Sequence, residues 1–470
     1  MVDVSGEGKG LAESIAKDLK GSTRGEVLLP GDNGYEQART VWNGMIDRHP
    51  AVIIRCQGAG DVIKAVRFAR QHGLVVSVKG GGHNVAGNAV NDNGMMIDLS
   101  KMRGVRVDPV NRRARVEPGA TWREFDREAQ AFGLATTGGL VSSTGVAGFT
   151  LGGGIGWLVR KHGLALDNLI SVDLITAEGE LVTANLEENR DLFWGVRGGG
   201  GNFGIVSSFE FKLHPVGPTV LGGLVLHQAS EARKLMEFFR DFSETAPVEL
   251  TMVMAFLTAP PLPFIPSELV GTHMIGVAVC YSGPLDEGER ILAPLKKYGI
   301  PVADVIEPMP YVFMQSSLDE TAPAGMRNYW KTAYLKELDD GTISTLLEFW
   351  ERIPSPLSAI HIHQLGGMLR KVDEGSTAYS NRDAKYVMNI VCGWEDPSED
   401  EKNINWTRDF FNAMQKYSTG AAYLNFLGEE GQDRVRAAYG EGKYRKLAEL
   451  KKKYDPTNFF HMNQNIKPAL

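Results

Sequence analysis

Val76-Ser77-Val78-Lys79-Gly80-Gly81-Gly82-His83-Asn84 is the stretch that decides how the rest of the chain is interpreted. A β-branched run enters a triple glycine, and a histidine follows at once. Three residues without side chains let several backbone N–H groups converge on one anion, the geometry that cradles a phosphate or pyrophosphate. A glycine-rich turn followed by a surface or capping histidine would have the same sequence. This stretch alone therefore does not distinguish a phosphate-binding loop from a structural turn.

Length and composition limit the class of protein. A chain of 470 residues exceeds one ordinary core, which favours two domains. Its 43% hydrophobic and 23% charged residues are typical of a soluble globular protein. A net charge of −7 argues against nucleic acid or an anionic membrane as the main partner.

The cysteines and the N-terminus bear on the compartment. Three widely spaced cysteines form neither a disulfide framework nor a metal-type spacing. Residues 1–21 have no apolar core of signal-peptide type, and no run is long enough to span a bilayer. We therefore expect a cytoplasmic protein without a membrane anchor.

Periodicity predicts the elements of the first half. Short helices are expected over residues 11–20 and 35–47, a buried strand over 51–56, a helix from Gly60 to Gly73 and a strand over 74–78 that delivers the glycine loop. A hairpin-rich region should follow, with strands over 95–99, 105–107 and 114–118. Thr121 and Glu124 have capping-box spacing and predict a helix to residue 133. A hairpin over 169–187 and a strand over 206–213 complete this half.

Two further glycine-rich segments, which we call glycine fields together with residues 80–82, follow later in the chain. Residues 136–156 alternate hydroxyls with glycines, which suits hydrogen bonds to a polar ring edge and to phosphate oxygens, although such a loop could also merely pack two layers. Residues 197–206 form the third field and lead into a strand. Three glycine fields and a histidine indicate a long cofactor held largely by backbone, and an extended dinucleotide such as FAD fits that footprint better than a mononucleotide.

The common nucleotide and hydrolase fingerprints are missing. No G-x-G-x-x-G lies between a strand and a helix with an acidic residue after the next strand, which argues against a Rossmann fold. The chain also lacks a P-loop, H-E-x-x-H and G-x-S-x-G.

From residue 219 to 420 glycines become sparse and the pattern changes. Strands are expected over 222–227, 251–257, 274–281, 359–364 and 387–392, alternating with helices near 230–245, 285–298, 341–353 and 401–416. This predicts an antiparallel sheet covered by helices on one face, within an α+β protein. His361 and His363 share one face of a strand; without an identifiable third ligand, a substrate-facing or structural role is favoured over a metal pair.

Four motifs in order resemble one family. They are K-G-G-G-H-N at 79–84, the second glycine field, D-L-F-W-G-V-R-G-G-G-G-N-F-G-I-V at 191–206 and K-K-Y-D-P-T-N-F-F-H-M-N-Q-N-I at 452–466. Together they resemble the berberine bridge enzyme-like FAD-linked oxidases of the vanillyl-alcohol oxidase/PCMH flavoprotein superfamily. The resemblance covers about residues 35–215 and 421–466. The middle of the chain is similar to the family only in its general pattern of residues and carries no specific motif.

The resemblance implies a fold and a division into domains. We expect a PCMH-type FAD-binding domain over residues 1–217 with its core at about 46–215, a substrate-binding domain over 218–420, and a segment over 421–470 that returns to the first domain.

It also implies that His83 is bonded covalently to the flavin. Many relatives add a second bond from a cysteine, but that position is Val141 here, so we expect a single covalent attachment. Thr144 occupies a position, usually branched and apolar, that the family uses to gate dioxygen access, and this leaves the final electron acceptor open.

The expected cofactor-binding set comprises the glycine fields and polar groups beside them. Its members are Lys79, Gly80, Gly81, Gly82, His83, Asn84, Gly87, Thr137, Gly138, Ser142, Ser143, Thr144, Gly145, Gly148, Gly153, Gly154, Gly204, Ile205, Val206, Asn425, Asn463 and Asn465. Asn463 and Asn465 are expected at the polar edge of the flavin.

The family commonly uses the tyrosine of Tyr-x-Asn as catalytic base, which is Tyr423 here. An ordinary phenol titrates near pH 10, so it needs a cation, hydrogen bonds or the oxidised flavin to act near neutrality. Packing against the flavin ring is the alternative role. The candidates for the substrate wall, each of which could equally be core, are Tyr329, Trp330, His361, His363, Gln364 and Tyr379.

The expected activity is an FAD-dependent oxidase that transfers hydride from an alcohol, such as a sugar hydroxyl or a hydroxylated secondary metabolite, with dioxygen as acceptor. A dehydrogenase using another acceptor and a flavin-binding protein without turnover are the alternatives. No metal is expected, and the oligomeric state is left open.

Overall fold

The computed structural model describes residues 19–470, and the helix expected over 11–20 lies almost wholly outside them. The first sheet has the order β1 (Glu26–Leu28), β2 (Val52–Arg55), β4 (Met95–Asp98) and β3 (Val76–Lys79). Helix α3 (Ala59–Gln71) connects β2 to β3. Residues 95–99, expected in a hairpin-rich region, instead form a strand that pairs in parallel with both β2 and β3. All four residues of β4 are buried, as is usual for a central parallel strand.

The helix expected over residues 35–47 is shorter than predicted. Helix α2 spans only Tyr35–Arg39. Beyond it, the backbone N–H of Trp42 donates to the Gly82 carbonyl at 3.0 Å, and that of Gly44 donates to the Met326 carbonyl at 2.8 Å. Tertiary hydrogen bonds therefore replace helical ones over this segment and bring it against the glycine loop.

A second, antiparallel sheet lies beside the first. Its order is β5 (Val105–Asp108), β6 (Arg113–Val116), β10 (Ile205–Lys212), β8 (Leu169–Ile175) and β9 (Leu181–Asn185). The hairpin predicted over 169–187 is confirmed as β8 and β9. The capping box is confirmed as well: the Glu124 carboxylate accepts from the Thr121 N–H at 2.9 Å, at the start of α4 (Trp122–Gln130).

The remaining elements of this part are short. They are β7 (Leu134–Ala135), α5 (Val146–Gly152), α6 (Val159–His162), η1 (Ala165–Asn168), α7 (Arg190–Val196), η2 (Gly200–Asn202) and β11 (His214–Pro215). Strand β11 pairs with β7 in a separate two-stranded sheet.

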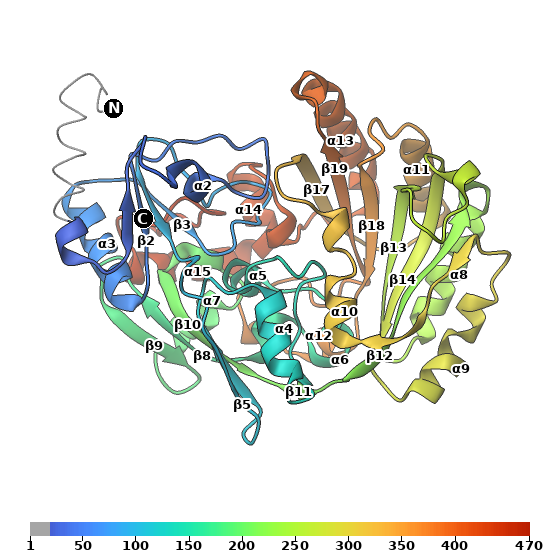
Figure 1. Ribbon diagram of the computed structural model, residues 1–470, viewed down its shortest axis with the longest axis horizontal. Helices are drawn as coiled ribbons and strands as arrows, with labels where there is room; N and C mark the ends of the chain where they lie inside the picture. Colours follow the sequence, from blue (N-terminus) through green and yellow to red (C-terminus); the bar gives the residue numbers. More distant parts are fainter. Residues whose placement is uncertain (1–18) are drawn as a thin grey trace.

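A large antiparallel sheet dominates the other half, on the right of Figure 1. Its eight strands are β15 (Ala303–Asp304), β12 (Thr219–Gln228), β14 (His273–Tyr281), β13 (Leu250–Thr258), β18 (Ala359–Gln364), β19 (Tyr386–Trp394) and β17 (Arg327–Leu335), in that order, with β16 (Glu307–Pro310) also paired to β12. The five strands predicted in this region are all present. Strand β17 was missed because Asn328, Lys331 and Thr332 interrupt its apolar pattern.

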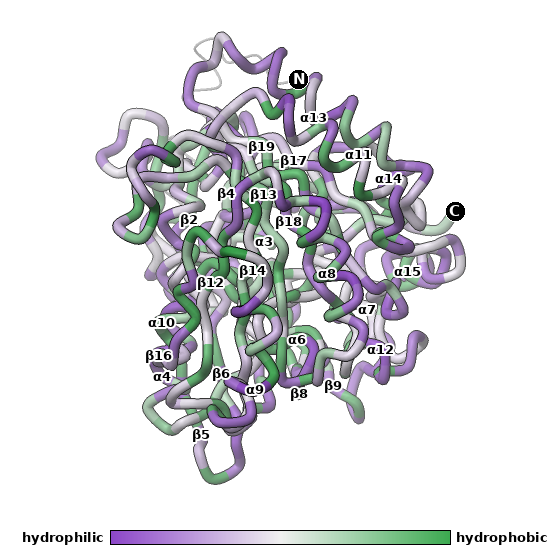
Figure 2. The backbone as a smooth tube through the Cα atoms, turned by 90° about the vertical axis from the view of Figure 1, so that its right-hand side faces the viewer, coloured by the Kyte–Doolittle hydropathy of each residue, from purple (hydrophilic) through white to green (hydrophobic). Residues whose placement is uncertain are grey.

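Four helices cover one face of this sheet, as predicted. They are α8 (Ala232–Thr245), α9 (Leu285–Lys296), α11 (Asp340–Glu351) and α13 (Asp400–Met414), and their apolar residues share one core cluster with the strands. Figure 2 shows the strands largely in hydrophobic colour, whereas the outer helices alternate between hydrophilic and hydrophobic residues. The other face of the sheet turns toward the first half of the chain. Smaller elements join these parts: α10 (Tyr311–Ser316), α12 (Met368–Lys371) and several 3₁₀ turns.

The C-terminal segment packs against the second sheet through α14 (Gln432–Tyr439) and α15 (Glu441–Tyr454). Beyond α15, Phe459 and Phe460 pack against the core of the first sheet. Lys451 and Asp455 form an ion pair at 2.7 Å whose side chains are both 0% exposed. The Lys451 ammonium also donates to the carbonyls of Asn202, at 2.6 Å, and Phe460, at 2.8 Å. The third glycine field is thereby joined to the last helix.

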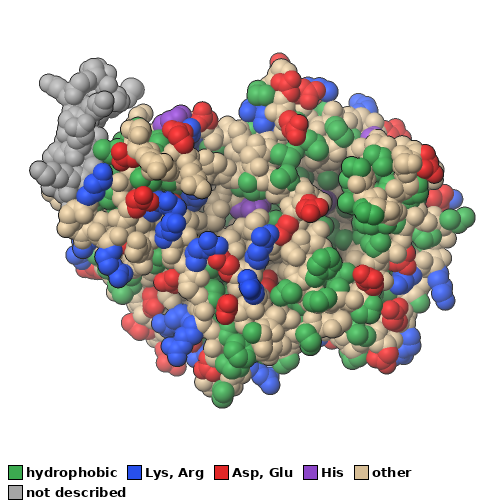
Figure 3. Space-filling model, in the orientation of Figure 1, with side chains coloured by type: hydrophobic (Ala, Val, Ile, Leu, Met, Phe, Trp, Pro, Cys, Tyr) green, Lys and Arg blue, Asp and Glu red, His purple; other side chains and the backbone are tan. Residues whose placement is uncertain are grey.

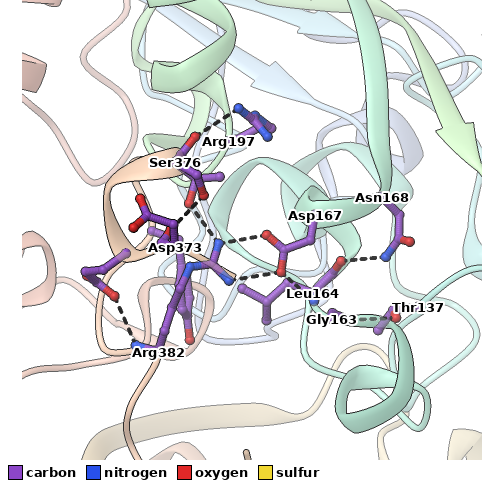
Figure 4. Close-up of polar contacts among 12 residues, drawn as sticks. Thr137, Gly163, Leu164, Asp167, Asn168, Arg197, Asp373, Ser376 and Arg382 are labelled. Carbon is purple, nitrogen blue, oxygen red and sulfur yellow. Dashed lines mark hydrogen bonds and ion pairs between the residues drawn. The ribbon is translucent and has the colours of Figure 1, made fainter. Parts of the chain in front are cut away.

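A second buried ion pair links the small elements to the large sheet. Figure 4 shows Asp167, from η1, facing Arg382, which lies between β18 and β19 in the sequence. The guanidinium makes two hydrogen bonds to the carboxylate, at 2.7 and 3.0 Å, and a third to the Thr377 hydroxyl at 2.8 Å. Such a bidentate contact fixes the relative orientation of the two segments.

Replacing Lys451 with methionine should lower the free energy of unfolding by about 3–5 kcal/mol, because the Asp455 carboxylate would stay buried without its cation. Chemical denaturation followed by circular dichroism measures this. Lys452→Met is the matched control: Lys452 is exposed on the same helix, and its ammonium reaches only the Leu470 carbonyl. A change within about 0.5 kcal/mol is expected for the control, and equal effects of the two substitutions would contradict the assigned role.

Candidate functional site

The glycine loop 80–82 follows β3 and meets the second glycine field backbone to backbone. A Cβ added to Gly81 would lie 2.6 Å from both the N and the Cα of Gly145, a distance that no side chain tolerates. Gly82 has φ +65°, the left-handed region that favours glycine. The loop can therefore approach its neighbour, and turn toward His83, only with glycine at these positions.

His83 is held by an aromatic stack. Its ring lies on that of Trp42, with centroids 4.6 Å apart and an interplanar angle of 14°. The Trp42 indole N–H donates to the Ala322 carbonyl at 3.0 Å, which fixes the supporting ring. Burial lowers the pKa of His83 to about 4, so its imidazole is neutral near pH 7. The Nε2 atom is buried without a hydrogen-bond partner.

The second glycine field forms another wall. The backbone N–H of Trp122 donates to the Thr144 carbonyl, and that of Arg123 donates to the Ser142 carbonyl. The Asp319 carboxylate accepts from both the N–H and the hydroxyl of Ser142, each at 2.7 Å. These bonds position Val141 and Thr144 toward a cavity.

The face of the large sheet that the helices leave uncovered forms the opposite wall. His361 on β18 pairs with Asn389 on β19, and Trp330 on β17 pairs with Val391 on β19. Side chains alternate between faces along a strand, so these residues and His363 share one face. Phe426, from the C-terminal segment, packs against both Trp330 and His363, with ring centroids 6.0 and 5.8 Å apart.

Between these walls lies a cavity of about 380 Å³. Of the residues 19–470 that line it, the only titratable side chains are His83, His361 and His363, and none is acidic, lysine or arginine. Burial lowers the pKa of His361 to about 4 and that of His363 to about 3. All three imidazoles are therefore neutral near pH 7. Figure 3 shows a hollow in the middle of this side of the molecule, with a histidine side chain visible in it.

Thirteen of the expected cofactor residues line the cavity. They are Gly80, Gly81, Gly82, His83, Asn84, Thr144, Gly145, Gly148, Gly204, Ile205, Val206, Asn425 and Asn463.

Nine others lie outside it. The Lys79 ammonium donates to the carbonyls of Ala38 and Thr40 at 2.8 Å each and so ties down the end of α2. The Thr137 hydroxyl donates to the Gly163 carbonyl, Ser142 is bound by Asp319, and Ser143 is exposed. The remaining five that do not line the cavity are Gly87, Gly138, Gly153, Gly154 and Asn465.

Tyr423 lies beside the cavity rather than in it, and no tyrosine from residues 19–470 is part of the lining. Its phenol oxygen accepts from the N–H groups of Gly154, at 2.8 Å, and Ile155, at 3.1 Å, and from the Asn425 amide at 2.9 Å. Burial raises the pKa of Tyr423, and these three donors oppose that shift. The role of Tyr423 as base stays a prediction.

The expected substrate residues divide between the two faces of the sheet. Trp330, His361 and His363 line the cavity. Tyr329 lies on the helix-covered face, where its hydroxyl accepts from Arg408 on α13, and the Gln364 amide donates to the Ser243 carbonyl on α8. Tyr379 is buried with its hydroxyl 2.7 Å from that of Tyr334. Tyr329, Gln364 and Tyr379 are therefore placed away from the cavity.

Three important residues had not been singled out from the sequence. Trp42 and Phe426 gave no local signal, because their contacts come from distant segments. Asn389 did give one: it is a single polar residue within the apolar run 387–392, and a polar residue at such a position needs a partner. Its Oδ1 atom is buried without one.

These features fit an FAD cofactor. Three glycine segments present backbone to one cavity, where side chains would block the approach. The apolar residues Val76, Leu99 and Phe460 line it too, and such side chains suit a planar base. The unpartnered Nε2 of His83 supplies a neutral nitrogen beside the glycine loop.

Comparison with known proteins agrees with this geometry. Residues 50–185 match a family model described as FAD binding domain, and residues 422–467 match one described as Berberine and berberine like. An FAD-linked oxidoreductase of Dictyostelium discoideum is 32% identical, covering 97% of this chain and 98% of the relative. The (R)-6-hydroxynicotine oxidase of Paenarthrobacter nicotinovorans is also 32% identical, over 95% and 97% of the two chains.

Solved structures show the same fold. The crystal structure of 6-hydroxy-D-nicotine oxidase from Arthrobacter nicotinovorans has a TM-score of 0.87 at 29% identity, covering 95% of this chain and 99% of that one. A berberine bridge enzyme-like protein of Physcomitrella patens also has a TM-score of 0.87, at 22% identity over 97% and 99% of the chains. The chain therefore belongs to the berberine bridge enzyme-like family of PCMH-type flavoproteins and is an FAD-dependent oxidoreductase.

Proposed function

We propose that this enzyme is an oxidase that carries FAD bonded covalently to His83 and dehydrogenates the CH–OH group of a small uncharged organic molecule, with dioxygen as the final acceptor. The observation that supports this most is the composition of the cavity: neutral imidazoles, aromatic rings and amides, without a charged side chain among residues 19–470. The name of the 32%-identical relative, a hydroxynicotine oxidase, is consistent with a small hydroxylated substrate.

In this proposal, different residues bind the cofactor, position His83 and bind the substrate. When bound, FAD supplies a two-electron acceptor for hydride. The glycine segments would hold its phosphates through backbone N–H groups, and Asn425 and Asn463 would hydrogen-bond the polar edge of the ring. Trp42 fixes the orientation of the His83 imidazole, whose neutral state lets a ring nitrogen act as a nucleophile. Residues 218–420 form the substrate-binding domain in this proposal.

We place the enzyme in the cytoplasm. Its three cysteines are free and buried, as is usual in a reducing compartment. Among residues 19–470, the helices are too short or too polar to cross a lipid bilayer.

The covalent bond can be tested by acid precipitation of purified protein. Yellow colour should stay with the pellet, and His83→Ala should release it to the supernatant. His72→Ala, which removes an exposed histidine, should keep the colour bound. Val141 lines the cavity where a second, cysteine-linked bond would form, so the His83 variant should retain no bound flavin after denaturation. A colourless wild-type protein that cannot be reconstituted with FAD would overturn the cofactor assignment.

The acceptor can be tested by mixing anaerobically reduced enzyme with aerated buffer. An oxidase should regain its flavin absorbance within seconds and release hydrogen peroxide. Recovery over minutes would instead favour a dehydrogenase with another acceptor. Thr144→Leu should slow recovery because a larger side chain enters the cavity wall, whereas Ser143→Leu, at the exposed neighbour, should not.

The substrate class can be tested with a panel of neutral alcohols, from benzyl alcohol to glucose, under anaerobic conditions. At least one should bleach the flavin. If none does, a flavin-binding protein without turnover becomes the better description.

A further inference from the structure

The polar groups of the sheet wall decide which alcohols the cavity can hold. Among residues 19–470, no charged side chain lines the cavity. His363 and Asn389 are part of the wall, but both ring nitrogens of His363 and the Oδ1 atom of Asn389 are buried beneath its surface. A molecule in the cavity cannot reach these atoms. The wall therefore offers fewer polar contacts than its residue types would indicate.

His361 is the exception on this wall. Its side chain is partly exposed, whereas that of His363 is 4% exposed. The ring nitrogens of His361 are not among the shielded, unpartnered atoms of residues 19–470. Burial alone lowers its pKa, which indicates that no hydrogen bond from the described residues engages the imidazole. A neutral imidazole provides one donor and one acceptor, so His361 is the polar side chain of the wall that a ligand contacts most readily.

Next to His361, the wall consists of aromatic rings and aliphatic carbon. Trp330 and Phe426 lie edge to face, with ring centroids 6.0 Å apart and an interplanar angle of 80°, and we call this pair the aromatic corner. The indole N–H of Trp330 donates to Oδ1 of Asn328 at 3.2 Å, so this ring presents carbon to the cavity. Val391, which pairs with Trp330 across the sheet, and Leu318 line the cavity too. An aromatic ligand packs well against such a surface.

The aromatic corner adjoins the groups that the expected reaction needs. Trp330 contacts Trp42, the ring that supports His83, with centroids 5.4 Å apart. Phe426 contacts Tyr423, the predicted base, edge to face with centroids 4.8 Å apart. A ring held against the aromatic corner therefore lies close both to the expected point of flavin attachment and to the predicted base.

Sugars and ions are poorly matched to these walls. A sugar has a hydroxyl on nearly every carbon, and each hydroxyl that leaves water without a new partner weakens binding about tenfold. Near the aromatic corner, the cavity offers the imidazole of His361 and the hydroxyls of Thr144 and Thr321, too few for such a molecule. A carboxylate or an ammonium would lose its water without gaining an opposite charge from the lining of residues 19–470.

We propose that the substrate is an uncharged aromatic alcohol whose ring packs against Trp330 and Phe426 and whose one further polar group hydrogen-bonds His361. This rests on the proposed function and narrows its substrate class. On oxidation, the C–H bond beside the hydroxyl gives up its electron pair as hydride to the FAD. The hydroxyl proton goes to the base, predicted to be Tyr423, and the alcohol becomes an aldehyde or a ketone. Trp330 and His361 then determine specificity.

Anaerobic stopped flow on the flavin-loaded enzyme compares substrates directly. The best of the three methoxybenzyl alcohol isomers should reduce the flavin at least about 10²-fold more efficiently than glucose, because glucose leaves several hydroxyls unpaired. The matching isomer of (hydroxymethyl)benzoate, which replaces the methoxy group with a carboxylate, should be slower by a similar factor. Equal or faster reduction by glucose or by the charged alcohol would overturn the proposal.

Binding gives a readout besides activity. 4-Fluorobenzamide has an aromatic ring and one polar group but no CH–OH group, so it cannot be dehydrogenated. Fluorine NMR on flavin-loaded protein should show that His361→Leu weakens its binding about tenfold, the loss expected for one hydrogen bond. 4-Fluorotoluene, which lacks the polar group, should bind both proteins alike. His227→Leu is the matched control and should bind 4-fluorobenzamide like the wild type, because His227 is fully buried on β12 of the same sheet, away from the cavity.

Equal binding of 4-fluorobenzamide by the wild type and by His361→Leu would overturn the His361 contact. The sugar probe 2-deoxy-2-fluoroglucose should show no binding at concentrations that saturate the enzyme with 4-fluorobenzamide. If it binds as tightly as the aromatic probe, the assigned substrate class is wrong.

The aromatic corner has its own test. Trp330→Leu should weaken the binding of both 4-fluorobenzamide and 4-fluorotoluene about three- to tenfold, because an aromatic contact is lost. Tyr329→Leu is the control: Tyr329 is the adjacent residue on β17, but it faces the helices and bonds Arg408. Wild-type affinity for both probes in Trp330→Leu would show that the ring packs elsewhere and would overturn the proposal.

These outcomes are distinct from failure of the proposed function. If the fluorinated aromatic probes bind as described but no alcohol bleaches the wild-type flavin, the proposed oxidation is wrong and the aromatic binding site stands. If glucose bleaches the flavin and the aromatic alcohols do not, the oxidation stands and only the assigned substrate class is wrong.

Discussion

The contact between Gly81 and Gly145 is the constraint on which the site depends. A methyl group on either residue would lie within 2.7 Å of the other's backbone, so neither position accepts any other amino acid without moving a loop. Because the contact brings the histidine loop against the second glycine field, it sets the distance between His83 and the wall that contains Val141 and Thr144. Because glycine has no side chain, the backbone at these positions is itself available as a surface for binding.

The expected cofactor site and the proposed substrate wall are built from different kinds of structure. The expected FAD contacts come from loops and helix ends, anchored by distant partners such as Asp319 and Lys451. The proposed substrate wall, in contrast, stands on three adjacent strands of a sheet whose other face is packed with helices. A wall built in this way is rigid because cross-strand hydrogen bonds and a helix-covered core both fix its side chains. His361, His363 and Asn389 are thus presented in a fixed pattern.

Local signals in the sequence predicted much of this arrangement. The glycine fields, the Thr121–Glu124 capping box, the β8–β9 hairpin and the helix-covered sheet all follow from patterns a few residues long. Features that depend on contacts between distant segments could not be predicted. The residues beyond Arg39 leave the helix because Gly82 and Met326 offer them better partners. The ammonium of Lys79 binds the carbonyls of Ala38 and Thr40 near α2 rather than lining the cavity for a similar reason, since these distant partners are within its reach. The direction of the Tyr423 hydroxyl is set by Gly154 and Ile155, 269 and 268 positions earlier in the chain.

The Lys451–Asp455 pair has a consequence for the order of events during synthesis. The Asn202 carbonyl, in the third glycine field, accepts a hydrogen bond from the Lys451 ammonium, 249 positions later in the chain. The Oδ1 atom of Asn202 accepts another from the backbone N–H of Ile466. A ribosome makes the N-terminal part first, so both N-terminal sheets can form before these partners exist. The cofactor site is therefore finished only when the last helix has emerged. A nascent chain stalled before that point would have both sheets without a complete binding surface, and flavin binding would be a late event in the maturation of the enzyme.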